Sequence, residues 1–268
     1  MTHDFLQYLA TNKNYSANTL RAYQTDLVQF AHWAKENATV ARWSRIEKSD
    51  IDRYVTYLYE MHKQPATITR HVSSLRSFYS WLQATGRMTK NPAQYVSSPK
   101  VAERVPETIS RGKITAALDS KAVSLTTKVM IAMMSETGIR VQEMLDLKVS
   151  DINTTERSIV IRGKGNKERK VYYGNRTASL LAQFLPAGFT GTLFTQTQRE
   201  VRSEIWKALQ SHPHALRHTF ATTMLNQGGS LEAIQWQLGH KASTTTQRYA
   251  RLGTPTVRQQ YIQFAPTF

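Results

Sequence analysis

The sequence predicts a mainly α-helical protein of two domains, with a small antiparallel β-sheet in the second domain. Three observations lead to this prediction. Apolar residues recur at helical spacing through the first 97 residues. The next stretch, 98–110, holds two prolines and sustains no period. Beyond it, segments of helical period flank one pair of alternating segments, at 158–162 and 169–173.

Composition points to a soluble protein with a polyanionic partner. Lysine and arginine number 35 against 19 aspartates and glutamates, a formal net charge of +16. Nucleic acid is the simplest polyanion to match this excess, and a merely basic cytoplasmic protein is the alternative. The absence of cysteine excludes disulfides, thiolate nucleophiles and cysteine-based metal sites. Without a long apolar run or a secretion signal, we expect a cytoplasmic protein with no membrane partner.

Residues 1–97 are predicted to form a bundle of helices. A short helix around residues 5–9 precedes a longer one that Ser16 or Asn18 caps. Ser49 is the expected cap of the next helix, and Pro65 opens the last, because proline is tolerated in a first helical turn. Each helix has apolar residues along one face, which predicts a common core.

Basic residues gather on the outer face of the helix that Pro65 opens. Arg70, His71 and Arg76 lie opposite its apolar positions. We predict that Arg70 and Arg76 contact a nucleic-acid backbone, with a solvated charged face as the alternative.

Residues 111–153 are predicted to be helical again, with a break at Thr137-Gly138. Arg140 then falls at a helix start, where free backbone N–H groups and the helix dipole favour an anion. Glu143, one turn later, is placed to hold Arg140 by a charge-assisted hydrogen bond. The motif alone is weak, since a surface arginine is the default for such a position.

The two alternating segments predict a β-hairpin whose turn is Gly163-Lys164-Gly165-Asn166. A lysine at the tip of a hairpin can enter a nucleic-acid groove. The nearby Lys167, Arg169 and Lys170 are predicted to contact the nucleic-acid backbone. The phosphate-binding pattern G-x-x-x-x-G-K-[ST] is absent, so ATP binding is not expected.

The last third of the chain concentrates chemically active side chains on three predicted helices. In the first, which Pro213 opens, a buried stripe of Leu216, Phe220 and Met224 leaves Arg217 facing elsewhere. Ser230 is the expected cap of the second, which Gly239 ends beside His240. Thr244 with Gln247 predicts a capping box for the third, which carries Tyr249.

An arginine, two histidines and a tyrosine on candidate site positions suit phosphate chemistry. A lone tyrosine on a helix is usually a packing residue. The position of Tyr249, nine residues after His240, is what favours a role in the site instead. His214 and His218 stand four residues apart, a spacing that can bind metal. No glutamate lies between them as in H-E-x-x-H and no cysteine completes a site, so we predict no metal and assign His218 to packing or support.

These motifs, taken together, resemble the tyrosine recombinase (phage integrase) family, in particular its Xer-like and transposon-encoded members. They are TGIRVQEML at 137–145, GKGNKERKV at 163–171, HALRHTFAT at 214–222, LGH at 238–240, and a tyrosine nine residues further on. The resemblance implies a helical core-type DNA-binding domain at 1–97, a linker at 98–110, and an α-rich catalytic domain with a C-terminal tail at 111–268.

The family resemblance implies a site-specific DNA recombinase, which cleaves and rejoins DNA through a 3′-phosphotyrosine and exchanges strands between two sites through a four-way junction. Tyr249 would be the nucleophile, and Arg140 and Arg217 would stabilise the transition state. Lys164 would protonate the leaving 5′-oxygen, and His214 would handle the proton of Tyr249. His240 would bond a non-bridging oxygen. Neither ATP, a metal nor another cofactor is implied.

Two other functions remain possible from the residues: a type IB topoisomerase-like DNA relaxer, and a DNA-binding protein whose site is vestigial. The expected partners are double-stranded DNA and three further copies of the chain, in a nucleoid-associated tetramer on two DNA sites. The tail segment TVRQQYIQF at 256–264 has an apolar stripe of Val257, Tyr261 and Phe264, too short to be stable alone. The resemblance favours its exchange into a neighbouring protomer, and docking on its own domain is the alternative.

Overall fold

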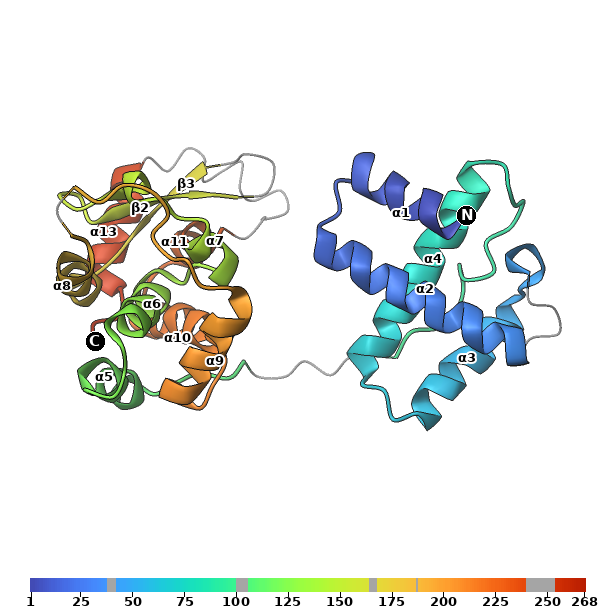
Figure 1. Ribbon diagram of the computed structural model, residues 1–268, viewed down its shortest axis with the longest axis horizontal. Coiled ribbons are helices and arrows are strands. Elements are labelled where there is room, and N and C mark those ends of the chain that lie inside the picture. Colours follow the sequence, from blue (N-terminus) through green and yellow to red (C-terminus); the bar gives the residue numbers. More distant parts are fainter. Residues whose placement is uncertain (38–41, 100–105, 164–167, 187, 240–253) are drawn as a thin grey trace. The chain divides into compact units, whose positions relative to one another are not determined.

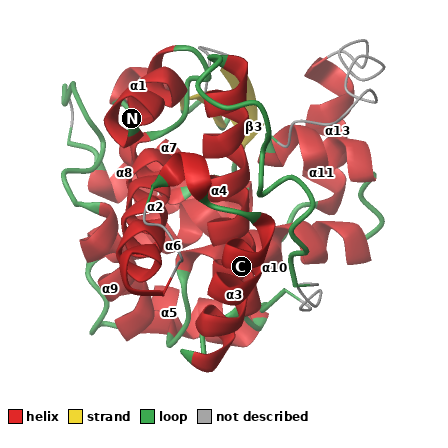
Figure 2. Ribbon diagram, turned by 90° about the vertical axis from the view of Figure 1, so that its right-hand side faces the viewer, coloured by secondary structure: helices red, strands yellow, loops and turns green. Residues whose placement is uncertain are grey.

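The computed structural model describes residues 1–37, 42–99, 106–163, 168–186, 188–239 and 254–268. The chain divides into two compact units, Met1–Arg104 and Val105–Phe268, both drawn in Figure 1. Helices dominate the described residues, as predicted, and one small sheet lies in the second unit (Figure 2). Among these residues, none of the helices has the length and apolar character needed to cross a bilayer.

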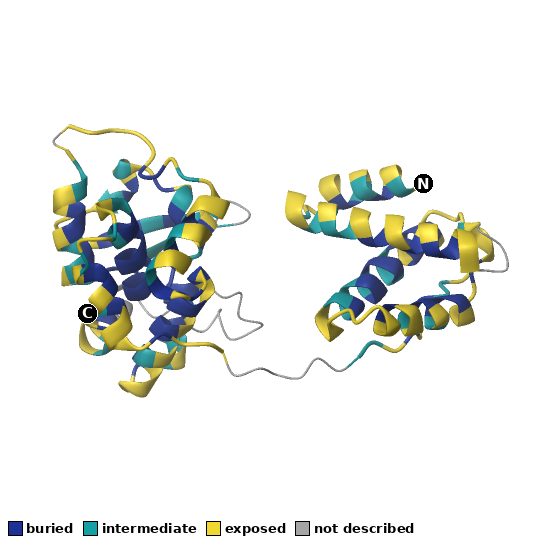
Figure 3. Ribbon diagram, turned by 60° about the horizontal axis from the view of Figure 1, so that its bottom comes forward, coloured by how far each residue is buried: buried dark blue, intermediate teal, exposed yellow. Residues whose placement is uncertain are grey.

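The N-terminal unit is a helical bundle around an aromatic core. Its elements are α1 (Thr2–Thr11), α2 (Ala17–Asn37), η1 (Trp43–Arg45), α3 (Lys48–Glu60) and α4 (Pro65–Ala84). Aromatic rings meet edge to face, with centroids 5.0 Å apart for Phe30 and Tyr54 and 4.7 Å apart for Trp43 and Phe78. Such pairs add to the burial of apolar surface that holds the helices together. Figure 3 shows the buried residues on the inward faces of the helices.

Helix starts in this unit are partly as predicted. Pro65 occupies the first turn of α4, as expected. The prediction that Ser49 caps α3 is wrong, because the helix already begins at Lys48 and Glu47 is its N-cap. The backbone N–H of Glu47 donates to the Asp50 carboxylate at 2.9 Å, so the first turn is closed by acidic residues instead of serine.

A buried polar cluster joins α2 to α4. Asp26 is fully buried, accepts a hydrogen bond from Arg70 Nη1 at 2.6 Å, and lies 3.2 Å from His71 Nε2. Burial raises the pKa of Asp26 to about 6 and lowers the pKa of His71 to about 4. The expectation that His71 lies on an outer face is wrong, since α2 and α3 cover it and it makes a 3.1 Å hydrogen bond with the Tyr54 hydroxyl.

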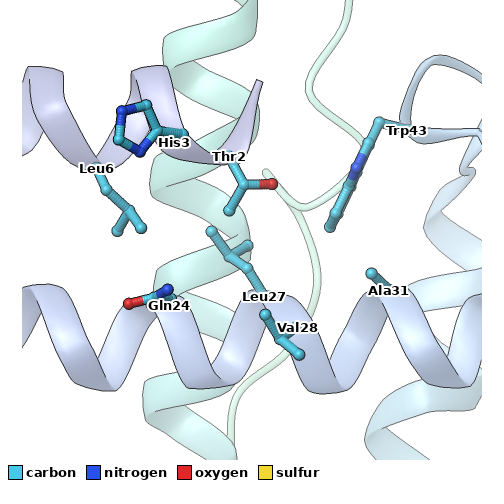
Figure 4. Close-up of a pocket in the computed structure, with 8 residues that line it drawn as sticks. All are labelled: Thr2, His3, Leu6, Gln24, Leu27, Val28, Ala31 and Trp43. Carbon is cyan, nitrogen blue, oxygen red and sulfur yellow. The ribbon is translucent and has the colours of Figure 1, made fainter.

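A pocket in the same unit opens between α1, α2 and the ring of Trp43 (Figure 4). Its walls are mostly apolar, and His3 is the one titratable group among its lining residues. The lining consists of Thr2, His3, Leu6, Gln24, Leu27, Val28, Ala31 and Trp43. The pocket therefore lacks the charged groups that phosphate chemistry needs.

The C-terminal unit is built around a helix that is buried along most of its length. Its elements are α5 (Arg111–Asp119), α6 (Leu125–Thr137), α7 (Val141–Leu145), η2 (Val149–Asp151), β1 (Ile152–Asn153), β2 (Ser158–Arg162), β3 (Glu168–Tyr172), α8 (Asn175–Phe184), α9 (Gln198–Leu209), α10 (Pro213–Asn226), α11 (Leu231–Leu238) and α13 (Thr254–Phe264). Every residue of α6 from Val129 to Thr137 is buried, with α8 and α10 packed against it. The end of α6 is therefore a fixed point for the elements around it.

The sheet is antiparallel with strand order β1-β2-β3, and Ile161 pairs with Arg169 across its long hairpin. The predicted first strand, 158–162, is confirmed, and the second begins one residue earlier than predicted, at Glu168. Of the residues between them, 164–167 lie outside the described part of the chain.

Helix α13 packs on its own unit. The Tyr261 side chain is buried, and its hydroxyl donates to the backbone oxygen of Glu136 at 3.1 Å. Phe264 lies against Gly228 and Gly229, and Gln260 Oε1 accepts a hydrogen bond from Ser230 N. The tail is therefore docked in cis in this structure.

The Asp26 cluster generates a stability prediction. Changing Arg70 to Met removes a partner of a buried carboxylate, so we expect the N-terminal unit to lose about 2 kcal/mol near neutral pH. The loss should shrink at about pH 5, because Asp26 is then protonated in the folded state and needs no cation. The measurement is native-state hydrogen exchange of α2 and α4 amides in the full chain.

A matched control is Lys48→Met, which breaks the exposed pair between Lys48 and Asp52. That change should cost no more than about 0.5 kcal/mol, because exposed ion pairs contribute little. Equal losses for the two variants would contradict the role given to Arg70.

Candidate active site

Arg140 is placed by the end of α6. Gly138 adopts the left-handed conformation there, with φ +66°, which confirms the predicted break. A Cβ atom at Gly138 would lie 2.6 Å from the side chains of both Phe220 and Leu238. Glycine is thus required both for the turn and for the close approach of α10 and α11. Two residues on, Arg140 is the N-cap of α7.

The predicted bond between Arg140 and Glu143 is present. Glu143 Oε2 accepts from the Arg140 backbone N–H, and Glu143 Oε1 accepts from Arg140 Nη1, both at 2.8 Å. The Arg140 side chain is 41% exposed, whereas that of Glu143 is 11% exposed. The carboxylate therefore fixes the guanidinium from one side and leaves its other side open to a ligand.

Arg217 is held from two directions. The stripe of Leu216, Phe220 and Met224 is buried as predicted, but Arg217 is buried as well, at 6% exposed. Its Nη1 donates to Gly138 O at 2.5 Å, and its Nη2 donates to Leu238 O at 2.8 Å. These bonds join the end of α6 to the end of α11, whose carbonyls carry the negative end of the helix dipole.

A third guanidinium, that of Arg169 on β3, completes the cluster. Its Nη1 and Nη2 donate to the two oxygens of Glu143 at 3.0 and 2.8 Å, and its Nε donates to Gln237 O at 3.2 Å. We predicted that Arg169 contacts the nucleic-acid backbone. Its side chain is only 12% exposed, however, and all three of its nitrogens bond within the protein. Sequence reasoning missed this arrangement, because Glu143 and Arg169 are 26 residues apart on different elements.

The cluster carries more positive than negative charge. Burial raises the pKa of Glu143, but the bonds from Arg169 and Arg140 outweigh it and hold the pKa below its ordinary value. Burial lowers the pKa of Arg217 to about 10, and the charges of Arg140 and Arg169 add to this effect. Three cations thus face one carboxylate, and an incoming anion would relieve their mutual repulsion.

His214 lies three residues before Arg217 on α10. Partial burial of its ring lowers its pKa below the ordinary value, and the charges of His212 and Arg217 act in the same direction. The imidazole is therefore neutral near pH 7 and able to accept a proton. His212 caps α10, with Nδ1 accepting from Ala215 N at 3.1 Å. No group of three potential metal ligands occurs in the described part of the chain.

Four predicted site residues lie outside the described residues: Lys164, Lys167, His240 and Tyr249. The predicted helix around Thr244 and Gln247 also lies outside them. Within the described residues, Arg140, Glu143 and Arg217 come together, and His214 shares a helix with Arg217.

Two family models match the chain. The model of the phage integrase family matches residues 111–254, and the model of the phage integrase N-terminal SAM-like domain matches residues 3–86. The tyrosine recombinase XerC of Listeria welshimeri is 30% identical, with 99% of this chain and 97% of the relative covered. The tyrosine recombinase XerD of Oceanobacillus iheyensis is 29% identical, with 98% of this chain and 97% of the relative covered.

The fold also matches a solved integrase structure. A lambda integrase dimer bound to a COC′ core site superposes with a TM-score of 0.70 at 17% identity, covering 91% of this chain and 96% of that one. At this identity the likeness shows the fold alone.

Proposed function

The chain belongs to the phage integrase family of tyrosine recombinases, and we propose that Tyr249 is the nucleophile with which it cleaves DNA. The protein is a site-specific recombinase, and its Xer relatives are tyrosine recombinases by name. The observation that supports our assignment is the excess positive charge around Glu143, where Arg140 and Arg217 are fixed beside each other. A phosphodiester under attack gains negative charge, which two forked guanidinium groups match.

The proposed reaction is an exchange of esters. The Tyr249 oxygen forms a bond to phosphorus while the bond from phosphorus to the 5′-oxygen breaks. The phenol proton passes to His214, whose lowered pKa keeps it neutral and ready to accept. Lys164 supplies a proton to the 5′-oxygen, and His240 bonds a non-bridging oxygen. The 5′-hydroxyl of another strand then attacks the phosphotyrosine, so no ATP is consumed.

DNA binding is proposed to involve both units, with residues 1–97 as the core-type DNA-binding domain, 98–110 as the linker and 111–268 as the catalytic domain. Arg70 and Arg76 are each bonded inside the N-terminal unit, but a guanidinium has five N–H donors and keeps some for phosphates. Lys170 pairs with Glu156 at the surface, an exposed pair that a phosphate can replace. Lys167 is proposed as a further contact.

The tail is proposed to change partners on assembly. Fourteen residues, 240–253, separate Gly239 from α13. That length spans up to about 45 Å when extended, enough to reach a neighbouring protomer. The apolar side chains that bury Tyr261 in cis would then receive the same helix from the neighbour in a tetramer on two sites. We place this assembly on the nucleoid, in the cytoplasm.

A topoisomerase-like relaxer would use the same chemistry without pairing two sites, and a vestigial DNA-binding protein would form no adduct. The Xer relatives favour recombination over both.

The nucleophile is tested with Tyr249→Phe on a nicked suicide substrate. The variant should bind DNA as the wild type does, because only one hydroxyl is lost, and it should form no covalent adduct on a denaturing gel. Tyr261→Phe is the control, since Tyr261 is buried and burial raises its pKa well above 10. An adduct that survives in Tyr249→Phe, or that is lost in Tyr261→Phe, would refute the assignment.

Tail exchange is tested by truncation after Gly253. The shortened protein should still bind one half-site but should assemble poorly on paired sites and lose ordered strand exchange. Light scattering of the DNA complexes and a recombination assay on paired sites measure the two effects. Normal tetramers with normal exchange would leave α13 as a packing element of its own unit.

A further inference from the structure

Arg169 is tied to the active site more tightly than a DNA-contacting arginine would be. Its guanidinium meets the Glu143 carboxylate through two parallel bonds, the fork geometry in which arginine binds carboxylates most strongly. At 12% exposed, the side chain has little surface left for a phosphate. By contrast, Arg162 on the neighbouring strand is half exposed, and it pairs with the buried carboxylate of Asp151 and the exposed one of Glu168.

Glu143 shares its two oxygens between two arginines. Oε1 accepts from both Arg140 and Arg169, and Oε2 accepts from the Arg140 backbone and from Arg169. Without Arg169, the carboxylate would keep its bonds to Arg140 but would lose the two that fix its plane. Arg169 therefore determines where Glu143 holds the Arg140 guanidinium.

Arg169 also fixes the end of α11. Its Nε bonds Gln237 O, and its guanidinium lies so close to Gly239 that a Cβ there would come within 2.7 to 2.8 Å of three guanidinium atoms. Gly239 has φ +64° and directly precedes His240 in the sequence. The Arg169 side chain on β3 thus contacts both Glu143, which holds Arg140, and the end of α11, which precedes His240 in the sequence.

We propose that Arg169 is a positioning residue for DNA strand cleavage, which acts through Glu143 and the end of α11 without touching the phosphate. This inference rests on the proposed function, because it assumes that Arg140 acts on the scissile phosphate. Arg169 adds to the positive charge of the site and, as a strand residue, links the hairpin to α7 and α11.

The test measures Arg169→Met and Arg169→Lys in the full chain on a nicked suicide substrate at saturating DNA. Arg169→Met should cleave about a hundredfold more slowly, the scale expected when a catalytic group is misplaced by about 1 Å. Arg169→Lys should cleave about tenfold more slowly or worse, because an ammonium keeps the charge but cannot bridge two oxygens. Half-site affinity and its salt dependence should match the wild type in both.

Two further variants separate positioning from general effects on the fold. Arg162→Lys changes an arginine of the same hairpin but keeps a cation beside the buried Asp151, and it should cleave at the wild-type rate. Glu143→Gln should slow cleavage, and adding Arg169→Met to it should cause a further loss well below the hundredfold that it causes alone, because part of its effect passes through Glu143.

Each alternative has its own outcome. Unchanged cleavage by Arg169→Met at saturating DNA overturns the proposal. If, in addition, the slope of log DNA affinity against log salt concentration falls by about one, Arg169 contacts a phosphate instead. Fully multiplying effects in the double variant also overturn it. If Arg169→Met fails to bind a half-site, Arg169→Lys decides, and normal cleavage by that variant counts against positioning. A wild-type protein that forms no adduct would instead refute the proposed function.

Discussion

The candidate active site depends on the bonds that the Glu143 carboxylate accepts, because they hold two of its three arginines. Arg140 and Arg169 bond the same pair of oxygens, and Arg217 is bonded to backbone oxygens at the ends of α6 and α11. One negative charge among three positive ones costs folding stability. This cost is explained if the DNA phosphate supplies the negative charge that balances the three arginines.

The fold makes this cluster possible by ending two helices at one place. Gly138 and Gly239 both adopt the left-handed conformation, so α6 and α11 stop with their last carbonyls available to Arg217 and its neighbours. Because α6 is buried from Val129 onward, its end cannot shift without disturbing the core. The geometry of the candidate site is therefore a consequence of core packing.

Periodicity and helix punctuation predicted much of this from the sequence. The stripe of Leu216, Phe220 and Met224, the break at Gly138 and the Arg140–Glu143 bond are local features, within a few residues of each other in the chain. The burial of His71 and the partners of Arg169 are not local. A helical pattern identifies one apolar face but does not tell which other element covers the opposite face. Contacts such as Arg169 with Glu143 arise only once β3 and α7 are packed.

If the arginines meet the charge that develops on the phosphate, removing Arg140 should matter most when that charge is present. The direct measurement compares the cleavage rates of wild type and Arg140→Ala on two substrates in EDTA. One has a normal scissile phosphodiester and the other an uncharged methylphosphonate. Arg140→Ala should cleave the phosphodiester about a hundredfold more slowly than wild type, whereas the loss on the neutral link should be less than about tenfold. Equal losses on the two substrates would show that Arg140 does not act on the charge of the phosphate.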